Sequence, residues 1–491
     1  MFLRLAIALG LCLPAVAAEP DDPQELTKSL SRLAEVLQQI ETRSALPVDT
    51  ASAFYKGALP GMVASLDPFS AFLDPDQFQS LQQMQRSTDT GFGSVLSVNH
   101  GRVVVLQTLP DSPSSRAGMS PGDEIVVING YPLANLSIDQ LVSLLSETRR
   151  REAELMVKRP DFARLIPLTL VPAELDDPSV KGDFLLKPGV AFVKVSSFGA
   201  ATDAELRQVI ERRGGSDLRG LVLDLRDNPG GVVESAVRSA AMFLEPRDRI
   251  LWIQGRDGPR EEVRVPEHVK PYRFPISVLI DDRTASAAEL LVGALQDHDR
   301  ARIVGSRSFG KGLVQSVFPL TENAGLALTT ARYLSPSGRP IQRPLENCRQ
   351  FQLDSCDQGP VQTYATDEGR EIPGGGGVEP DVAAYPRNYS EFEIFLLSVD
   401  AVLQFAQGYV REHEDIAADF EVDSELLDEF QLYLSERKVR PTLSEWTSSA
   451  EFIRARLKQE ILNLTVGVDA GDEVEMRNDP QVLAALRAMT L

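Results

Sequence analysis

The sequence has few of the residues that build metal sites and histidine-based catalytic sites. Its 491 residues include three cysteines and four histidines. No cysteine–histidine cluster and no phosphate-binding glycine loop is present, so we expect no cofactor and no metal. The histidines (His100, His268, His298 and His413) lie in no recognisable triad signature. A catalytic site built on histidine is therefore not indicated.

Basic residues and long apolar runs are also scarce. The sequence has 50 lysines and arginines against 71 aspartates and glutamates, which gives a net charge of -21. Phosphate binding needs a basic face, so nucleic acid is excluded as a partner. Beyond the first twenty or so residues, no apolar run is long enough to span a bilayer. A content of 43% hydrophobic and 25% charged residues is typical of a globular protein, and the length predicts about three domains.

The N-terminus has the pattern of a secretory signal peptide. MFLRLAIALGLCLPAVAA combines a basic residue, an apolar run and small residues at Ala17 and Ala18. Leu11 precedes Cys12 where a lipoprotein signal needs a small residue, so lipidation is not expected. We expect export to a bacterial periplasm and a mature chain that starts near Glu19.

Export leaves two cysteines in an oxidising compartment. Cys348 and Cys356 lie eight residues apart in one loop, and we predict that they form a disulfide.

A serine lies at a predicted strand-to-helix turn between Pro275 and Phe318. Residues 276–280 are short, apolar and β-branched, while residues 287–296 have helical apolar spacing. Ser286 therefore lies beside the first N–H groups of a helix, which lack intrahelical partners and favour negative charge. That position suits a nucleophile and a developing oxyanion.

Lys311 is the base that the sequence offers to this serine. A serine needs a base to take its proton. Lys311 lies between two glycines, which let the backbone pack closely, so that the amine can be buried. Burial favours the neutral amine, which is what a general base must be. Gln315, four residues on, shares a strand face with Lys311 and can orient the amine without adding charge. Taken singly, Ser286 would be a helix cap and Lys311 a surface lysine; their joint pattern favours catalysis.

The stretch VLIDDRTASAAELLVGALQDHDRARIVGSRSFGKGLVQ closely resembles the catalytic region of the carboxyl-terminal processing proteases, also called tail-specific proteases. The resemblance implies that Ser286 is the nucleophile, Lys311 the general base and Gln315 the residue that positions the lysine.

Residues 224–231, DLRDNPGG, resemble the oxyanion segment of the same family. The resemblance makes the backbone N–H of Gly230 or Gly231, together with that of Ala287, the candidates for the oxyanion hole. Residues 66–75, LDPFSAFLDP, resemble the segment that precedes the peptide-binding module in this family.

Residues 85–172 resemble a PDZ domain. The resemblance lies in Gly-Phe-Gly at 91–93, in LPDSPSSRAGMSPGDEIVVING and in the helical SIDQLVSLLSE. The glycine loop can present N–H groups to a terminal carboxylate, and the following strand can accept an extended peptide by β-augmentation. The predicted peptide-binding residues are Gly91, Phe92, Gly93, Ser94, Leu141 and Leu144 or Leu145.

The predicted fold class is multidomain α/β. Apolar runs at 190–195 and 221–225 alternate with helical segments, which implies an α/β core, and the resemblance implies a spiral core of the crotonase/ClpP-like kind. An amphipathic N-terminal helix either packs on its own domain or makes a subunit contact. The predicted parts are a signal peptide at 1–18, N-terminal helices at 19–84, a PDZ domain at 85–172, a protease core at 173–387 with an insertion at 343–376, and a C-terminal helical region at 388–491.

These patterns predict a periplasmic serine endopeptidase that binds polypeptide C-termini and cleaves by acyl transfer. One alternative is a peptide-binding scaffold whose PDZ domain works beside a silent protease core. Another is a non-proteolytic hydrolase on a related spiral core. Proteins of the family that the sequence resembles often meet substrates through partner lipoproteins or cell-wall enzymes, so an adaptor lipoprotein stays open. A homo-oligomer stays open as well. The sequence names neither these partners nor the natural substrate.

Overall fold

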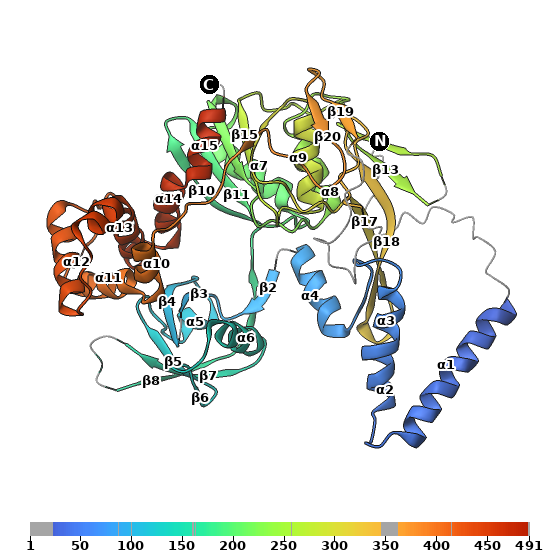
Figure 1. Cartoon of the computed structure of the whole chain (residues 1–491), viewed down its shortest axis with the longest axis horizontal. Coiled ribbons are helices and arrows are strands. Elements are labelled where there is room, and N and C mark those ends of the chain that lie inside the picture. The colour runs from blue at the N-terminus through green and yellow to red at the C-terminus, as the bar shows by residue number, and fades with distance from the viewer. Residues whose placement is uncertain are drawn as a thin grey trace.

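The computed structural model describes residues 23–86, 88–99, 101–159, 162, 164–256, 258–344, 362–413 and 415–489. The predicted signal peptide and the predicted disulfide between Cys348 and Cys356 lie outside these residues. Figure 1 shows N-terminal helices at one end, a central α/β core, a PDZ domain beside the core and C-terminal helices at the other end. The predicted multidomain α/β class, with its PDZ domain and its terminal helices, is confirmed.

Six strands form the core sheet, in the order β10-β11-β12-β15-β16-β21. β10 is antiparallel to β11, and every later pair is parallel. β12 and β15 are buried along their whole length, as expected of parallel strands that are covered on both faces. The strands span Val180–Lys187 (β10), Val190–Val195 (β11), Gly220–Asp224 (β12), Ile276–Ile280 (β15), Arg302–Gly305 (β16) and Val382–Ala383 (β21).

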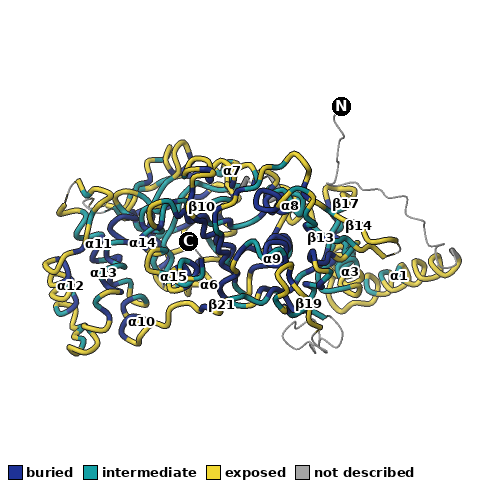
Figure 2. The backbone as a smooth tube through the Cα atoms, turned by 90° about the horizontal axis from the view of Figure 1, so that it is seen from above, coloured by how far each residue is buried: buried dark blue, intermediate teal, exposed yellow. Residues whose placement is uncertain are grey.

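Helices from distant parts of the chain cover the two faces of this sheet. Three helices share the main core on one face: α7 (Thr202–Arg213), α8 (Val233–Ala241) and α9 (Ala287–Asp297). On the other face α15 (Pro480–Ala488) buries Val482 and Ala485 against the sheet, and Ser277 Oγ donates a 2.9 Å hydrogen bond to the Ala485 carbonyl. Figure 2 shows this buried centre in dark blue. The last helix of the predicted C-terminal region is thus a layer of the α/β core.

A second sheet joins the N-terminal segment to the strand that carries Gln315. The ten-residue strand β18 pairs with β17 along one edge and with both β1 and β13 along the other. β14 completes the sheet beyond β13. The strands span Ala71–Leu73 (β1), Arg249–Gly255 (β13), Glu261–Arg264 (β14), Leu313–Pro319 (β17) and Gly325–Leu334 (β18). A separate hairpin, β19 (Thr363–Ala365) with β20 (Glu371–Pro373), lies near the end of α9.

The PDZ domain is built from a sheet in the order β3-β4-β5-β7-β8, with β6 beside β5. Its elements are β3 (Ser94–Asn99), β4 (Arg102–Thr108), α5 (Pro113–Arg116), β5 (Glu124–Ile128), β6 (Tyr131–Pro132), α6 (Ile138–Thr148), β7 (Ala153–Lys158) and β8 (Ile166–Leu170). The antiparallel pair β2 (Thr88–Gly91) and β9 (Ala173–Asp176) connects it to the core. Asn99 Nδ2 also donates to the Leu397 carbonyl at 3.1 Å, so the C-terminal helices contact the PDZ domain directly.

The C-terminal helices α10 to α13 enclose a core of their own, which includes Phe405, Phe430 and Ile453. They span Glu391–Ser398, Ala401–Glu412, Ser424–Glu436 and Leu443–Thr465, and α14 (Val468–Asn478) leads from them to α15. None of the described helices combines the length and the apolar character that crossing a bilayer requires.

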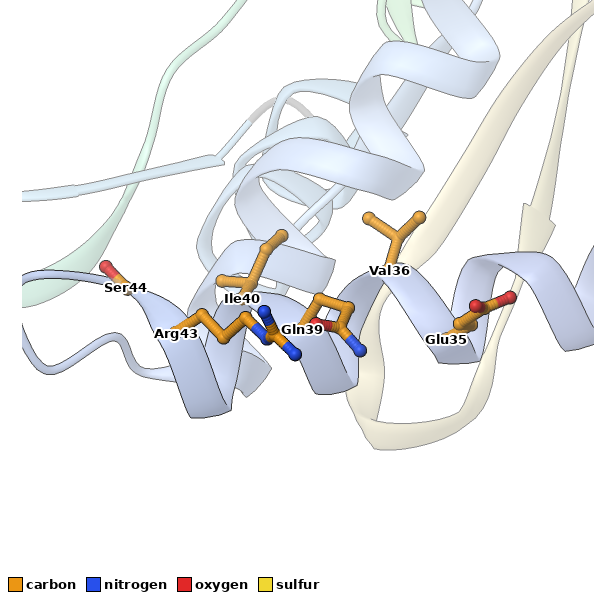
Figure 3. Close-up of a pocket in the computed structure, with 6 residues that line it drawn as sticks. All are labelled: Glu35, Val36, Gln39, Ile40, Arg43 and Ser44. Carbon is orange, nitrogen blue, oxygen red and sulfur yellow. The ribbon is translucent and has the colours of Figure 1, made fainter.

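Helix α1 (Pro23–Arg43) projects from the molecule with its side chains largely exposed (Figures 1 and 2). Leu26 and Leu30 are each 58% exposed, so within this chain the apolar stripe is not covered by its own domain. A shallow pocket lies along this helix and is lined by Glu35, Val36, Gln39, Ile40, Arg43 and Ser44 (Figure 3). It contains none of the predicted catalytic residues. The remaining N-terminal helices are α2 (Thr50–Ala53), a π-helical turn (Phe54–Ala58), α3 (Leu59–Ala64) and α4 (Pro75–Arg86).

Candidate active site

Ser286 occupies the predicted turn between β15 and α9. Its backbone has φ 56° and ψ -116°, a conformation that residues other than glycine rarely adopt. Such strain costs about 1–3 kcal/mol and persists only where neighbouring groups hold it. Thr284 Oγ1 donates to the Leu225 carbonyl at 2.8 Å, and Ala285 N–H donates to the Asn228 carbonyl at 2.9 Å. The turn is therefore attached to the segment that follows β12, and Ser286 itself stays half-buried between buried alanines.

The two candidate oxyanion glycines differ in what their N–H groups contact. Gly230 N–H donates to Asn228 Oδ1 at 2.8 Å, so this donor is already used. The N–H groups of Gly231 and Ala287 have no hydrogen-bond partner within the described residues. A Cβ on Gly230 would lie 2.8 Å from Ser286 Cβ and 2.9 Å from the Ala287 nitrogen. Gly230 thus keeps the space beside the serine open, and Gly231 is the glycine left with a donor to offer.

Lys311 lies just before β17 and contacts the predicted glutamine. Lys311 Nζ donates to Gln315 Oε1 at 2.7 Å. Burial lowers the pKa of Lys311 below its usual value, against the opposing charges of Asp67 and Glu289. Within the described segments around them, no hydrogen bond joins the Ser286 hydroxyl to Lys311. Catalytic hydrogen bonds often tighten only when substrate binds. The local environment favours the neutral amine that a general base requires.

Glu289, which the sequence analysis missed, connects the serine turn to the lysine loop. Its carboxylate is fully buried and accepts four hydrogen bonds: from the backbone N–H groups of Ser286 (2.9 Å), Gly310 (2.7 Å) and Lys311 (2.8 Å), and from Ser308 Oγ (2.5 Å). Burial raises the pKa of Glu289, while these donors act in the opposite direction. One side chain therefore fixes both halves of the site.

Tyr333, on β18, holds the same two residues through their carbonyl groups. Its single hydroxyl proton is shared between the carbonyls of Ser286 (2.6 Å) and Lys311 (2.5 Å). The side chain is 1% exposed, and burial raises the pKa of Tyr333 well above its usual value. It therefore remains a donor across the working pH range. Glu289 and Tyr333 together hold the N–H and the C=O of both candidate catalytic residues.

The sequence does contain a signal for Glu289 but none for Tyr333. Ser286 and Glu289 have the spacing of a helix capping box, which predicts a local contact at a helix N-terminus. Nothing in that spacing shows that the carboxylate also reaches Gly310 and Lys311, because those residues come from another loop. Tyr333 lies 47 residues after Ser286 and 22 after Lys311, so only the fold brings it to them.

The predicted peptide-binding residues lie around the start of β3. Gly91 pairs with Ala173 in the connecting sheet, and Gly93 has φ 71°, where a Cβ would lie 2.4 Å from Ser112 Cβ. The Ser94 and Ser114 hydroxyls lie 3.1 Å apart. The Phe92 carbonyl accepts from Ser114 N–H. The backbone of this loop is thus held in one conformation.

The helix residues of the predicted groove differ in exposure. Leu141 has no exposed surface and belongs to the PDZ core, so in this conformation it offers no surface to a ligand. Leu144 and Leu145 are half-buried against that core. Among the residues that the structure describes, no group of three or more histidine, cysteine, aspartate or glutamate side chains could hold a metal ion.

Two parts of the chain match known protein families. Peptidase family S41 matches residues 189–347, which include Ser286 and Lys311, and a PDZ domain matches residues 104–159. The chain is 32% identical over 300 residues to a carboxyl-terminal-processing protease of Synechocystis, covering 58% of this chain and 68% of that one. It is also 32% identical over 303 residues to the protein of that name in Picosynechococcus, covering 60% and 72%.

A solved structure is similar as well. The photosystem II D1 C-terminal processing protease is 28% identical, covers 71% of this chain and 86% of its own, and superposes with a TM-score of 0.38. The sequence relatives and the matched family together assign the chain: it belongs to peptidase family S41 and is a PDZ-containing serine protease of the carboxyl-terminal-processing type.

Proposed function

We propose that this protease is an endopeptidase that works through a Ser286–Lys311 acyl-enzyme mechanism. The neutral Lys311 amine takes the proton of Ser286 Oγ as that oxygen attacks the substrate carbonyl. The N–H groups of Gly231 and Ala287 stabilise the oxyanion. Lys311 then gives its proton to the leaving amine, and the acyl group stays on Ser286. In the second half, Lys311 takes a proton from water, the hydroxide attacks the ester, and the proton returns to Ser286 Oγ.

One observation carries this mechanism: Lys311 is half-buried, with a pKa lowered by burial, and its amine has the uncharged Gln315 as its hydrogen-bond partner. A carboxylate in that place would hold the lysine protonated, whereas an amide oxygen orients the amine without fixing a proton on it. The contacts of Glu289 and Tyr333 support the same mechanism, because they fix the backbones of Ser286 and Lys311 relative to each other.

We also propose that the PDZ domain reads polypeptide C-termini. β3 is an edge strand that pairs only with β4 within the described residues, so its other edge can accept an extended peptide. The loop that precedes it, at 91–93, can present N–H groups to the terminal carboxylate. Hydrogen bonds to a charged group are the stronger kind, which favours a free carboxylate over an amide.

The experiment compares two forms of one internally quenched peptide, with a free and with an amidated C-terminus. We expect amidation to lower kcat/KM about tenfold or more, because charge-assisted hydrogen bonds contribute roughly 1.5–3 kcal/mol. Ser286→Ala should cleave neither form. Equal cleavage of both forms by the wild type would contradict recognition of the C-terminal carboxylate. Turnover by Ser286→Ala would contradict the acyl-enzyme mechanism.

Two further statements, on the kind of core and on the location of the protein, complete the proposal. The core is of the spiral, crotonase/ClpP-like kind. Two neighbouring sheets support this proposal: the core sheet, whose strand β15 leads to Ser286, and the second sheet, whose strand β17 follows Lys311. The protein is periplasmic, and its signal peptide is removed near Ala17 and Ala18, supported by the basic, apolar and small residues of the first eighteen positions. N-terminal sequencing of the exported protein tests the second statement, and a mature chain that retains Met1 would contradict it.

A further inference from the structure

A short segment far from the catalytic residues in sequence lies directly on the candidate base. We name residues 67–73 the strap; it follows α3 and ends with β1. β1 pairs with β18, with Ala71 opposite Ala327 and Leu73 opposite Gly325. Phe69, just before β1, contacts both Gln315 and Lys311. The strap is therefore attached to the second sheet at the point where that sheet carries the lysine and its glutamine.

The backbone of the strap decides which end of the Gln315 amide faces the lysine. The Phe69 carbonyl accepts a hydrogen bond from Gln315 Nε2, and Gln315 Oε1 accepts from Lys311 Nζ at 2.7 Å. A primary amide has one accepting end and one donating end, and a carbonyl can accept only from the donating end. With Phe69 in place, the oxygen must point to Lys311. Without it, the amide can rotate and turn its NH₂ group toward the amine.

The side chain of Phe69 covers the lysine. Its ring centroid lies 5.0 Å from Lys311 Nζ, and the ring packs edge-to-face on Phe309 with centroids 6.5 Å apart. An aromatic face attracts an ammonium, which favours the charged amine, but it also excludes water, which favours the neutral amine. Burial is the larger influence at Lys311. The ring therefore acts mainly as a cover.

The strap is shaped and attached by its own polar groups. Asp67 Oδ1 accepts the N–H groups of Phe69 and Ser70, both at 2.8 Å, and Asp67 Oδ2 accepts from Ser70 Oγ at 2.6 Å. Ser70 Oγ accepts from Thr329 N–H of β18 at 3.1 Å. Two charged groups act on Lys311: Asp67 of the strap and Glu289 of α9.

We propose that the strap is a positioning element for the catalytic base and that Phe69 is its acting residue. When the strap is docked on β18, the Phe69 carbonyl orients Gln315 and the Phe69 ring keeps water from Lys311. When it is undocked, the amine is solvated and its glutamine is free to turn, so the enzyme is idle. This inference rests on the proposed role of Lys311 as the base.

The test measures kcat against pH for the full chain, with an internally quenched peptide that has a free, apolar C-terminus. For Phe69→Ala we expect kcat at pH 7 to fall about 10- to 100-fold, because small errors in position are costly in catalysis. The rising limb of the profile should move to higher pH, because water reaches the amine. Phe69→Leu keeps an apolar cover and should recover most of the activity and the original limb.

A second variant should move the profile in the opposite direction. Asp67→Asn keeps the Oδ1 acceptor for the strap's two N–H groups but removes a negative charge that favours protonated Lys311. The rising limb should therefore move to lower pH. Phe318→Ala, which truncates an exposed phenylalanine at the far end of β17, is the matched control and should leave both kcat and the limb unchanged.

Each outcome decides the matter. A wild-type profile for Phe69→Ala, or an equal loss in Phe69→Ala and Phe69→Leu with the limb unmoved, overturns the inference. If Phe69→Ala fails to fold, Asp67→Asn decides alone, and an unmoved limb there is also negative. An active Lys311→Arg enzyme would instead refute the proposed mechanism itself. An inactive Lys311→Arg enzyme beside a wild-type Phe69→Ala profile would refute only the role of the strap.

Discussion

Replacing Lys311 with arginine is expected to abolish turnover as completely as replacing it with alanine. Arginine keeps the positive charge but cannot lose its proton at any working pH, so it cannot accept the proton of Ser286. Loss of a general base typically costs about 10²- to 10⁴-fold in rate. The measurement is kcat on one peptide for Lys311→Arg, Lys311→Ala and the wild type, each shown to be folded by its thermal transition.

The pH dependence of the wild type follows from the same argument. In the proposed mechanism the active form of Lys311 is neutral. The neutral fraction grows as pH rises, so activity should rise with pH through the pKa of this residue. A solvated lysine titrates near ~10.4. Because burial lowers the pKa of Lys311, the midpoint of the rise should lie below that value. A midpoint at or above the solvated value would contradict the buried neutral base.

His298 serves as the control, because a histidine mechanism would need it. It follows the eleven-residue helix α9, whereas Ser286 precedes that helix, so the two lie about 18 Å apart along the axis. Its ring nitrogens contact Asp367 Oδ2 and the Arg249 carbonyl, each at 2.7 Å. We expect folded His298→Ala to keep its turnover. An active Lys311→Arg enzyme together with an inactive His298→Ala enzyme would reverse the assignment of the base.

The isosteric change Glu289→Gln is expected to lower kcat about a hundredfold or more, although it alters one atom. Each carboxylate oxygen of Glu289 accepts two hydrogen bonds, and an amide has only one accepting end. Whichever way the glutamine turns, its NH₂ group faces at least one backbone N–H: that of Gly310, or those of Ser286 and Lys311. An unsatisfied buried donor costs about 1–3 kcal/mol, so the serine turn and the lysine loop should separate. A small displacement of catalytic groups is enough for this loss of rate.

Glu393→Gln separates positioning from stability in this experiment. Glu393 is also a buried capping-box glutamate, at the start of α10, where it accepts from Ser390 N–H at 2.9 Å and from Arg387 at 2.8 Å. Both variants should lower the denaturation midpoint. Only Glu289→Gln should lower kcat, with KM little changed, because Glu289 contacts the proposed catalytic residues and Glu393 does not. Equal kcat values for the two variants would show that Glu289 has no positioning role.

Much of the site could be predicted from the sequence because its signals are local. The β-branched run at 276–280 and the helical spacing after Ser286 together predict a strand-to-helix turn, and the structure has that turn. Lys311 and Gln315 lie four residues apart, so the two-residue period of a strand predicts that they share a face. The structure then brings Lys311 Nζ to 2.7 Å from Gln315 Oε1. The PDZ domain and the α/β class follow in the same way from motifs that lie within one stretch of chain.

The tertiary structure alone decided which distant groups complete this site. Tyr333 and Phe69 reach the site from another strand and from the N-terminal segment, and no periodic pattern links them to Ser286. The choice between the two oxyanion glycines also depended on the fold, because it turns on whether Asn228 already binds the Gly230 N–H. Neighbours in sequence fix backbone shape and side-chain period. A buried carboxylate, a tyrosine hydroxyl and a covering ring must instead satisfy donors, acceptors and empty volume, and those exist only once the sheets have packed together.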